Sequence, residues 1–217
     1  MNEESAAARH GRRAAQGART RRAILAAAMN IASVEGLEGL SLGRLAGELQ
    51  ISKSGLFAHF GSKEELQLAT LDAAAAAFDR AAVQPALEAE PGLPRLLRLC
   101  DGWLGFTDGS VFRGGCFFAA AAADFDGRPG PVRDRVASIM RGWLGSLEEA
   151  IREAIAAGHL QPKADPAQLA FELNALQLGA NWARQLLDDG RAFARARAAL
   201  HEHLRAGATA AGRRLIA

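Results

Sequence analysis

The sequence predicts an all-α protein in which a short N-terminal unit precedes a larger helical body. Tyrosine is absent and long runs of β-branched residues are missing, whereas alanine, leucine and arginine are abundant. This composition favours helix over strand. Apolar residues also recur at helical spacing in segment after segment, separated by clusters of glycine and proline. The spacing predicts about nine helices.

The net charge of +2 is unevenly distributed over the 217 residues. Residues 1–63 contain 9 Lys and Arg against 5 Asp and Glu, whereas the rest of the chain contains 17 against 19. A basic segment joined to a neutral body is typical of proteins that bind nucleic acid through one domain. For Arg12 and Arg13 alone, a solvated basic tail is the alternative.

The first helix is expected to begin near Thr20. Residues 1–17 carry no apolar stripe, so a disordered basic tail is expected there. After Thr20 the apolar residues fall on one helical face, which Gly36 and Gly39 then end. The face consists of Ile24, Leu25, Ala28, Ile31 and Ala32.

Two short helices joined by a tight turn follow the first helix. Ser41 is a good N-cap for one that extends to about Leu49, and Ser52 caps one that extends to about Phe60. Such a pair forms a helix-turn-helix, whose second helix can enter the major groove of DNA. The side chains expected to fill the wedge between the helices are Leu45, Leu49, Ile51 and Leu56.

Six further helices are expected after this unit. A capping box at Ser62 begins the fourth helix, which should end near Val83 because Pro85 follows. Glycine and proline punctuate the rest of the chain. The remaining helices are expected at about 93–108, 116–123, 132–157, 166–187 and 191–204.

The eighth expected helix, 166–187, is apolar on two sides, and a helix of this kind is buried on two sides. One stripe is Leu169, Leu173, Leu176, Ala180, Ala183 and Leu187; the other is Phe171, Ala175, Leu178, Trp182 and Leu186. The ninth helix, 191–204, has one apolar face and outward arginines. The sequence therefore predicts a homodimer through helices 8 and 9, packed as an intermolecular four-helix bundle.

Several classes of protein find no support in the sequence. No secretory h-region or membrane-spanning run is present, so a cytoplasmic protein is expected. Cys100 and Cys116 form no disulfide framework, which suits a reducing compartment. Because no nucleophile with a base, paired catalytic carboxylates, phosphate-binding loop or metal-ligand set is found, we expect neither an enzyme nor a cofactor.

The stretch from Thr20 to Leu71 resembles the TetR (tetracycline-repressor) family. Three motifs carry the resemblance: Thr20-Arg21-Arg22-Ala23-Ile24-Leu25, Leu56-Phe57-Ala58-His59-Phe60 and Ser62-Lys63-Glu64-Glu65-Leu66. The resemblance implies a DNA-binding domain at 18–65 and a domain for effector binding and dimerisation at 66–217. Two positions depart from the family pattern. Gln50 stands where glycine is usual, which strains a left-handed turn, and Phe57 stands where tyrosine is usual, which removes a hydroxyl that would reach a phosphate.

The positions of residues on this motif imply how the domain would contact DNA. Base contacts are expected from Arg44, Lys53 and Ser54, with Gly55 allowing close approach of the helix. Phosphate contacts are expected from Thr20, Arg21, Ser41, His59 and Lys63. Ser52 and Phe57 complete the expected DNA-binding set. The alternative for Arg44 and Lys53 is that they are ordinary exposed charges.

The resemblance also implies a ligand site in the helical body. The candidates are Cys100, Trp103, Leu104, Phe106, Cys116, Phe117, Phe118, Met140, Trp143, Asn174, Gln177, Asn181 and Trp182. Asn174, Gln177 and Asn181 form a polar strip on an otherwise apolar helix, which solvent, a partner or a ligand must satisfy. Plain core packing is the alternative for each apolar candidate.

The sequence thus predicts a ligand-responsive repressor that binds a palindromic double-stranded DNA operator as a homodimer. A small apolar effector is expected to release it, and no membrane partner is expected. One alternative keeps the fold but makes Cys100 or Cys116 a redox or electrophile sensor. Another makes the body a helical protein-interaction module with weak DNA binding.

Overall fold

The computed structural model describes the backbone of residues 3–109 and 111–216, and the side chains of residues 15–109 and 111–216. Over these residues the chain is helical, and an isolated bridge between Leu160 and Ala208 is the only strand-like pairing. The all-α prediction is therefore confirmed. The elements are α1 (Glu3–Glu35), α2 (Leu42–Leu49), α3 (Lys53–Phe60), α4 (Lys63–Phe78), the π-helical turn η1 (Asp79–Val83), α5 (Gln84–Leu87), α6 (Leu93–Asp108), α7 (Phe117–Phe125), α8 (Pro131–Ala156), α9 (Pro166–Leu187), α10 (Ala192–Gly207) and α11 (Ala210–Arg213).

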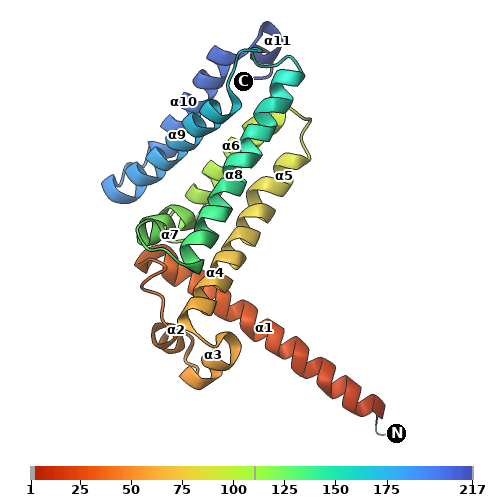
Figure 1. The fold of residues 1–217 in the computed structure, drawn as a ribbon, viewed down its shortest axis with the longest axis vertical. Helices are drawn as coiled ribbons and strands as arrows, with labels where there is room; N and C mark the ends of the chain where they lie inside the picture. The colour runs from red at the N-terminus through yellow and green to blue at the C-terminus, as the bar shows by residue number, and fades with distance from the viewer. Residues whose placement is uncertain (1–2, 110, 217) are drawn as a thin grey trace.

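The helices are arranged as a small head at one end of a long bundle (Figure 1). The head contains α2, α3 and the part of α1 that packs on them. The bundle consists of α4 with its continuation η1 and α5, together with α6, α8, α9 and α10. Helix α7 lies where the bundle meets the head and packs on both α1 and α8. Helices α4 and α7 therefore both connect the bundle to the head.

The first helix begins earlier than its apolar pattern predicts. Helix α1 starts at Glu3 and not near Thr20, so the tail expected at 1–17 is helical from Glu3. Alanine and arginine, which are good helix formers, dominate this stretch. The apolar stripe could not reveal the extension, because that stripe begins only where α1 meets the rest of the head. Met1 and Asn2 lie outside the described residues.

The predicted end of the fourth helix near Val83 is wrong. The chain passes from α4 through η1 into α5, which ends at Leu87. Pro85 cannot donate to the carbonyl four residues before it, and the π-helical turn directly precedes this break in the hydrogen-bond ladder. Gly102 of α6 permits close packing here, because a Cβ at this position would lie 3.0 Å from the Ala82 carbonyl oxygen. With η1, α5 and α11, the described chain has more elements than the nine predicted.

The first apolar stripe of α9 is largely covered within the chain, whereas the second is covered mainly at Leu178. Leu173 and Ala180 of the first stripe are buried, although Leu187 at its end is exposed. On the second stripe Phe171, Trp182 and Leu186 are each more than half exposed. Helix α10 buries its predicted inner face against the bundle, namely Phe193, Ala196, Leu200 and Leu204.

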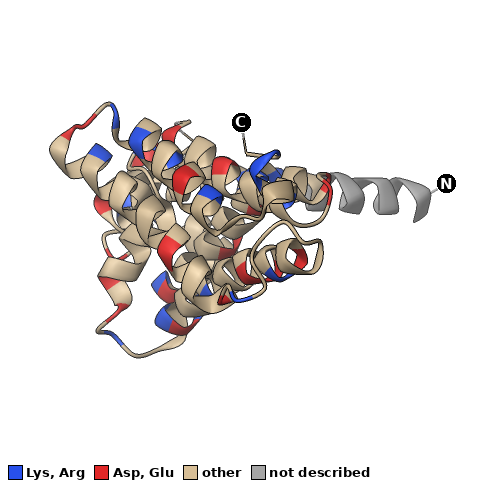
Figure 2. Cartoon of the chain, turned by 90° about the horizontal axis from the view of Figure 1, so that it is seen from above, with Lys and Arg blue, Asp and Glu red and all other residues tan. Residues whose placement is uncertain are grey.

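Charge is mixed over the surface of the bundle. Figure 2 shows Lys and Arg interspersed with Asp and Glu along the helices. In the part of the chain that the structure describes, no helix is long and apolar enough to cross a membrane. The apolar stripe on α9 therefore stands out against a surface of mixed charge.

Candidate DNA-binding surface and ligand cavity

The predicted helix-turn-helix is present, and side chains cap both of its helices. Ser41 Oγ accepts a hydrogen bond from the Arg44 amide at 3.1 Å, and Ser52 Oγ accepts one from the Gly55 amide at 3.0 Å. Each cap satisfies an amide that the helix itself leaves unpaired. Gln50 between the helices adopts the left-handed conformation, with φ 53° and ψ 39°. The expected strain at this non-glycine residue is therefore located in the turn.

The wedge between α2 and α3 is filled mainly by two leucines. Leu45 and Leu56 are fully buried, and Leu49 is partly buried against them. Ile51, which we expected to share this role, is 38% exposed. It follows the left-handed Gln50, and the reversal of the backbone there turns Ile51 away from the wedge.

One face of α3 is free to meet DNA. Lys53, Ser54 and Gly55 in its first turn are exposed, and Phe57 is 57% exposed. Within the described part of the chain Lys53 forms no ion pair. An exposed lysine at the N-terminal end of the second helix has the position from which such helices contact base edges. Ser54 Oγ donates to Ser52 Oγ at 3.2 Å, and this hydrogen bond orients both hydroxyls.

Arg44 is held by two carboxylates. Its guanidinium donates to Glu35 at 2.8 Å and to Glu48 at 2.9 Å. These hydrogen bonds raise the pKa of Arg44, and the bond to Glu35 contributes most. Ion pairs that are exposed to solvent contribute little to stability, so DNA can displace them. In the free protein Arg44 is therefore paired with carboxylates. It is neither an exposed charge without a partner nor a side chain already free to contact bases.

Two of the residues expected to contact phosphates make structural contacts within the head. Lys63 Nζ donates to the Glu38 carbonyl oxygen at 2.6 Å and to its carboxylate at 3.1 Å. This pairing is the main cause that lowers the pKa of Glu38. Arg21 Nη1 donates to the His59 carbonyl oxygen at 3.0 Å, and its guanidinium lies 4.4 Å from the centre of the Phe60 ring. Arg21 therefore fastens α1 to the end of α3.

The carboxylates that engage these cations escaped the sequence analysis. Glu48 could have been found, because Arg44 and Glu48 have the four-residue spacing of a helical ion pair. Glu35 lies nine residues from Arg44 across an irregular turn, and Glu38 lies 25 residues from Lys63. Neither pairing has a signal in the local sequence. Thr20 and His59 are partly buried at the edge of the head.

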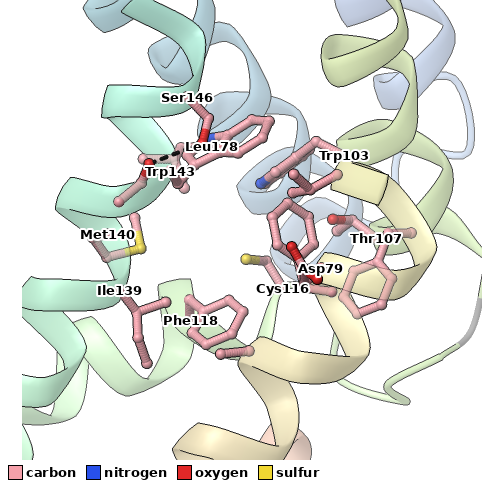
Figure 3. A pocket seen from close by; sticks show the side chains of 15 residues that line it. Asp79, Trp103, Thr107, Cys116, Phe118, Ile139, Met140, Trp143, Ser146 and Leu178 are labelled. Carbon is pink, nitrogen blue, oxygen red and sulfur yellow. Dashed lines mark hydrogen bonds between the residues drawn. The ribbon is translucent and has the colours of Figure 1, made fainter. Parts of the chain in front are cut away.

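The bundle contains an apolar cavity of about 310 Å³ (Figure 3). Six of the predicted ligand residues line it, namely Trp103, Phe106, Cys116, Phe118, Met140 and Trp143. The other lining residues were not predicted: Ala75, Phe78, Asp79, Val83, Thr107, Ile139, Gly142, Ser146 and Leu178. Every major helix of the bundle except α10 contributes to the wall. Cavities of this size and character are typical sites for small molecules.

Aromatic rings form a connected cluster around the cavity. Phe78 packs edge-on against Phe106 and Trp143, with ring centres 5.2 Å apart in each pair, and against Phe118 at 6.3 Å. Edge-to-face contacts of this kind favour a fixed arrangement of rings. Trp143 Nε1 donates to Asn174 Oδ1 at 3.2 Å, which fixes the indole from behind.

The other predicted ligand residues do not line the cavity. Cys100, Leu104 and Phe117 are buried in the core, and Trp182 is exposed on α9. The polar strip on α9 is used for structural hydrogen bonds: Asn174 binds Trp143, Gln177 Nε2 donates to the Cys100 carbonyl oxygen at 3.4 Å, and Asn181 Oδ1 accepts from the Cys116 amide at 2.9 Å. The strip is therefore satisfied largely by the protein itself.

Comparisons with known proteins agree with this geometry. Residues 24–70 match the family model for bacterial regulatory proteins of the tetR family, and residues 92–200 match the model for the tetracyclin repressor-like C-terminal domain. Together the matches cover well over half of the chain. The chain belongs to the TetR family of transcriptional regulators.

Solved TetR-family structures share the fold over almost the whole chain. A regulator from Chloroflexus aurantiacus is 24% identical, with a TM-score of 0.81 over 89% of this chain and 98% of that one. A regulator from Cytophaga hutchinsonii is 23% identical, with a TM-score of 0.78 over 90% and 97%. AibR, solved with isovaleryl coenzyme A and operator DNA, is 21% identical, with a TM-score of 0.68 over 85% and 96%. A comparison with curated protein sequences gave no significant match.

Both cysteines of this TetR-family chain are free and buried. Burial raises the pKa of the Cys100 thiol to about 12. Burial also raises the pKa of Cys116, although backbone amides of Ala119 and Phe118 act against the shift. A thiol that stays protonated is a poor nucleophile. The geometry thus disfavours the alternative in which a cysteine is the sensor.

Two helices, α4 and α7, contact both the cavity and the head. Helix α4 lines the cavity with Phe78 near its end and holds the head through Lys63 at its start. Helix α7 begins beside the cavity at Cys116, and near its end Asp124 Oδ2 accepts from the Glu38 amide at 3.1 Å. Glu38 is therefore held from both helices.

A second contact, from the turn that precedes α7, also links this region to the head. The Gly114 amide donates to Ser33 Oγ of α1 at 3.3 Å. A Cβ at Gly114 would lie only 1.6 Å from the Ser33 carbonyl oxygen, so only glycine fits this approach. A displacement of the start of α7 would therefore also move α1 through this contact.

Proposed function

We propose that this chain is a ligand-responsive repressor that binds a palindromic operator as a homodimer. The proposed DNA-binding domain spans 18–65, and the effector and dimerisation domain spans 66–217. One observation carries the proposal: α4 and α7 both line the apolar cavity and both hold Glu38 of the head. AibR, a structural relative, was solved with both a ligand and operator DNA, which supports the pairing of these two functions in this fold.

On this proposal the effector is small and largely apolar, and it acts from the cavity. A ligand changes DNA affinity only through its different affinity for two arrangements of the protein. The two recognition helices of a dimer must lie about 34 to 36 Å apart to enter successive major grooves. A modest shift of α4 or α7 displaces each head and breaks this spacing. The ligand therefore lowers operator affinity.

The proposed dimer forms through α9 and α10. Phe171, Trp182 and Leu186 form an apolar stripe that is exposed in the monomer. Exposed apolar patches commonly mark protein–protein interfaces. Burying it against the same stripe of a second copy gives a two-fold interface and presents two heads to the DNA. We therefore expect sedimentation to show a dimer at micromolar concentration and Trp182→Glu to yield a folded monomer. Leu87→Glu, which places a charge on a half-exposed leucine of α5, is the matched control.

Selection of bound fragments from genomic DNA tests the proposed function. The expected result is enrichment of a palindrome whose half-sites are about one helical turn apart or a multiple of it. A competing gel shift on random DNA gives the ratio of specific to non-specific affinity, which we expect to be about 10³ or more. If no sequence is enriched, or if wild-type protein is monomeric, the proposal is wrong.

A further inference from the structure

A polar group without a partner lies in the wall of the apolar cavity. Thr107 is only 5% exposed, and within the described protein its hydroxyl forms no hydrogen bond. A buried threonine in a helix ordinarily donates to the carbonyl one turn back, as Thr70 does to Leu66 at 2.7 Å. Because an unsatisfied buried hydroxyl is costly, its presence in a cavity wall points to a ligand atom as its partner.

A single carboxylate lies in the same wall. Asp79 is half-buried in η1, where Gln84 Nε2 donates to its Oδ2 at 3.1 Å. No other residue that lines the cavity carries a carboxylate, an ammonium or a guanidinium group. Figure 3 shows Asp79 and Thr107 on the same side of the cavity, opposite Ile139 and Met140 of α8. The close packing of α6 on η1 at Gly102 brings these two residues onto adjacent elements.

The rest of the wall suits a cation with an apolar body. Five aromatic rings line the cavity, namely Phe78, Trp103, Phe106, Phe118 and Trp143. The face of an aromatic ring attracts a cation, and this attraction is strongest when water is excluded. A neutral hydrocarbon would use the rings but leave Thr107 unsatisfied and Asp79 without a counter-charge. An anion would be repelled by Asp79.

We propose that the effector is a hydrophobic amine bound in its protonated form, whose N–H groups donate to the Asp79 carboxylate and to Thr107 Oγ1. This inference rests on the proposed function, because it names the class of effector for the same cavity. The apolar part of the amine lies among the aromatic rings, and the ammonium group lies at η1. The tilt of α4 then responds to the ligand at its end, where η1 continues the helix.

Calorimetry with three matched probes on the full-length protein tests the inference. The probes are 3-phenylpropylamine, 3-phenylpropan-1-ol and 3-phenylpropanoate, which share one apolar body and differ in charge. A hydrogen bond to a charged group favours the amine over the alcohol by about tenfold or more in affinity. The carboxylate probe should bind most weakly. Equal affinity of the amine and the alcohol, or no binding of the amine, would overturn the inference.

Two variants show whether the preference depends on the assigned residues. Asp79→Asn keeps an acceptor for Gln84 but removes the charge, so the amine should lose its advantage over the alcohol. Thr107→Val keeps the shape of the side chain and should lower amine affinity about fivefold. Asp72→Asn is the control. Asp72 lies on the surface of α4, where it pairs with the exposed Arg135 of α8, and it does not line the cavity. A preference that survives Asp79→Asn contradicts the assignment.

Operator binding without ligand is measured on the same preparations, so that the two proposals fail separately. Specific DNA binding with no preference for the amine overturns the inference alone. Preference for the amine without sequence-specific DNA binding overturns the proposed function alone.

Discussion

The head takes its candidate DNA contacts from residues 20–63, whereas the cavity takes its walls from residues 75–178. In the head the functional side chains are exposed, and caps and ion pairs hold them. In the cavity they are buried, and the packing of rings from several helices sets their positions. A change in the head should therefore alter DNA affinity with little loss of stability, while a change in the cavity should alter both stability and response.

The two regions also differ in whether their charged side chains are paired with opposite charges. In the head Glu35, Glu48 and Glu38 engage the cations Arg44 and Lys63 before DNA arrives. Operator binding must exchange these weak surface pairs for contacts with bases and phosphates. In the cavity one carboxylate, that of Asp79, lies among aromatic rings with no cation in the wall. Arg44 and Lys63 of the head are thus paired within the protein, whereas the carboxylate of the cavity is left for a ligand.

The largest expected effect contrasts two tryptophans. Trp143 is 7% exposed in the cavity wall, whereas Trp182 is 56% exposed on α9. Trp143→Ala should lower the free energy of unfolding by about 3 to 5 kcal/mol and abolish the ligand response. Trp182→Ala should cost less than about 1 kcal/mol per protomer in its own fold and act mainly on dimerisation. Denaturant unfolding with sedimentation measures both, and similar losses of stability would contradict the contrast.

A smaller effect separates specific from general contacts in the head. Lys53→Ala should lower operator affinity by about 1 to 3 kcal/mol and relax base preference, because Lys53 is the unpaired cation of α3. Lys63→Ala should weaken binding to operator and random DNA alike. Lys163→Ala, an exposed lysine in the loop before α9, is the matched control. Equal losses on operator and random DNA for Lys53→Ala would show that it does not contact bases.

The smallest effect concerns the turn of the helix-turn-helix. Gln50→Gly should raise the free energy of unfolding by about 1 kcal/mol, because glycine adopts the left-handed conformation without strain. Thermal unfolding measures the change. Gln185→Gly, at an exposed right-handed position near the end of α9, should destabilise instead. A loss of stability in Gln50→Gly would show that the left-handed turn is not strained.

The sequence predicted the head in detail because its determinants are local. Ser41, Ser52 and Ser62 each cap the helix that follows, and the left-handed Gln50 was recognised from its place in the motif. The contacts of Arg21 with His59 and of Arg44 with Glu35 were not predicted, because these partners lie on other elements. Ion pairs across a fold are not encoded in neighbouring residues.

The cavity was predicted only in part, for a physical reason. Trp103 and Trp143 are large and aromatic and were expected in a pocket, but Phe117 has the same character and is buried core. Which ring faces a cavity depends on how α4, α6, α7 and α8 pack together. Asp79 and Thr107 gave no signal at all, since a single acid or hydroxyl on a helix is ordinarily solvated or bonded to its own backbone.

The central claim is that filling the cavity displaces the head from its operator, and a pair of glycines tests it most directly. Gly142 lines the cavity and Gly145 lies one turn away on α8 outside it, and an added Cβ would meet no atom within 4 Å at either position. Gly142→Phe places a ring in the cavity, as an effector would. Gly145→Phe adds the same ring to the same helix elsewhere.

Operator affinity of these two variants is the deciding measurement. Gly142→Phe should weaken binding by a factor of about 5 to 150, the range expected for allosteric coupling, while Gly145→Phe should bind like wild type. Both variants should remain folded dimers, because replacing a helical glycine does not disfavour the helix. If Gly142→Phe is folded, dimeric and binds the operator as tightly as Gly145→Phe, the cavity does not control the head.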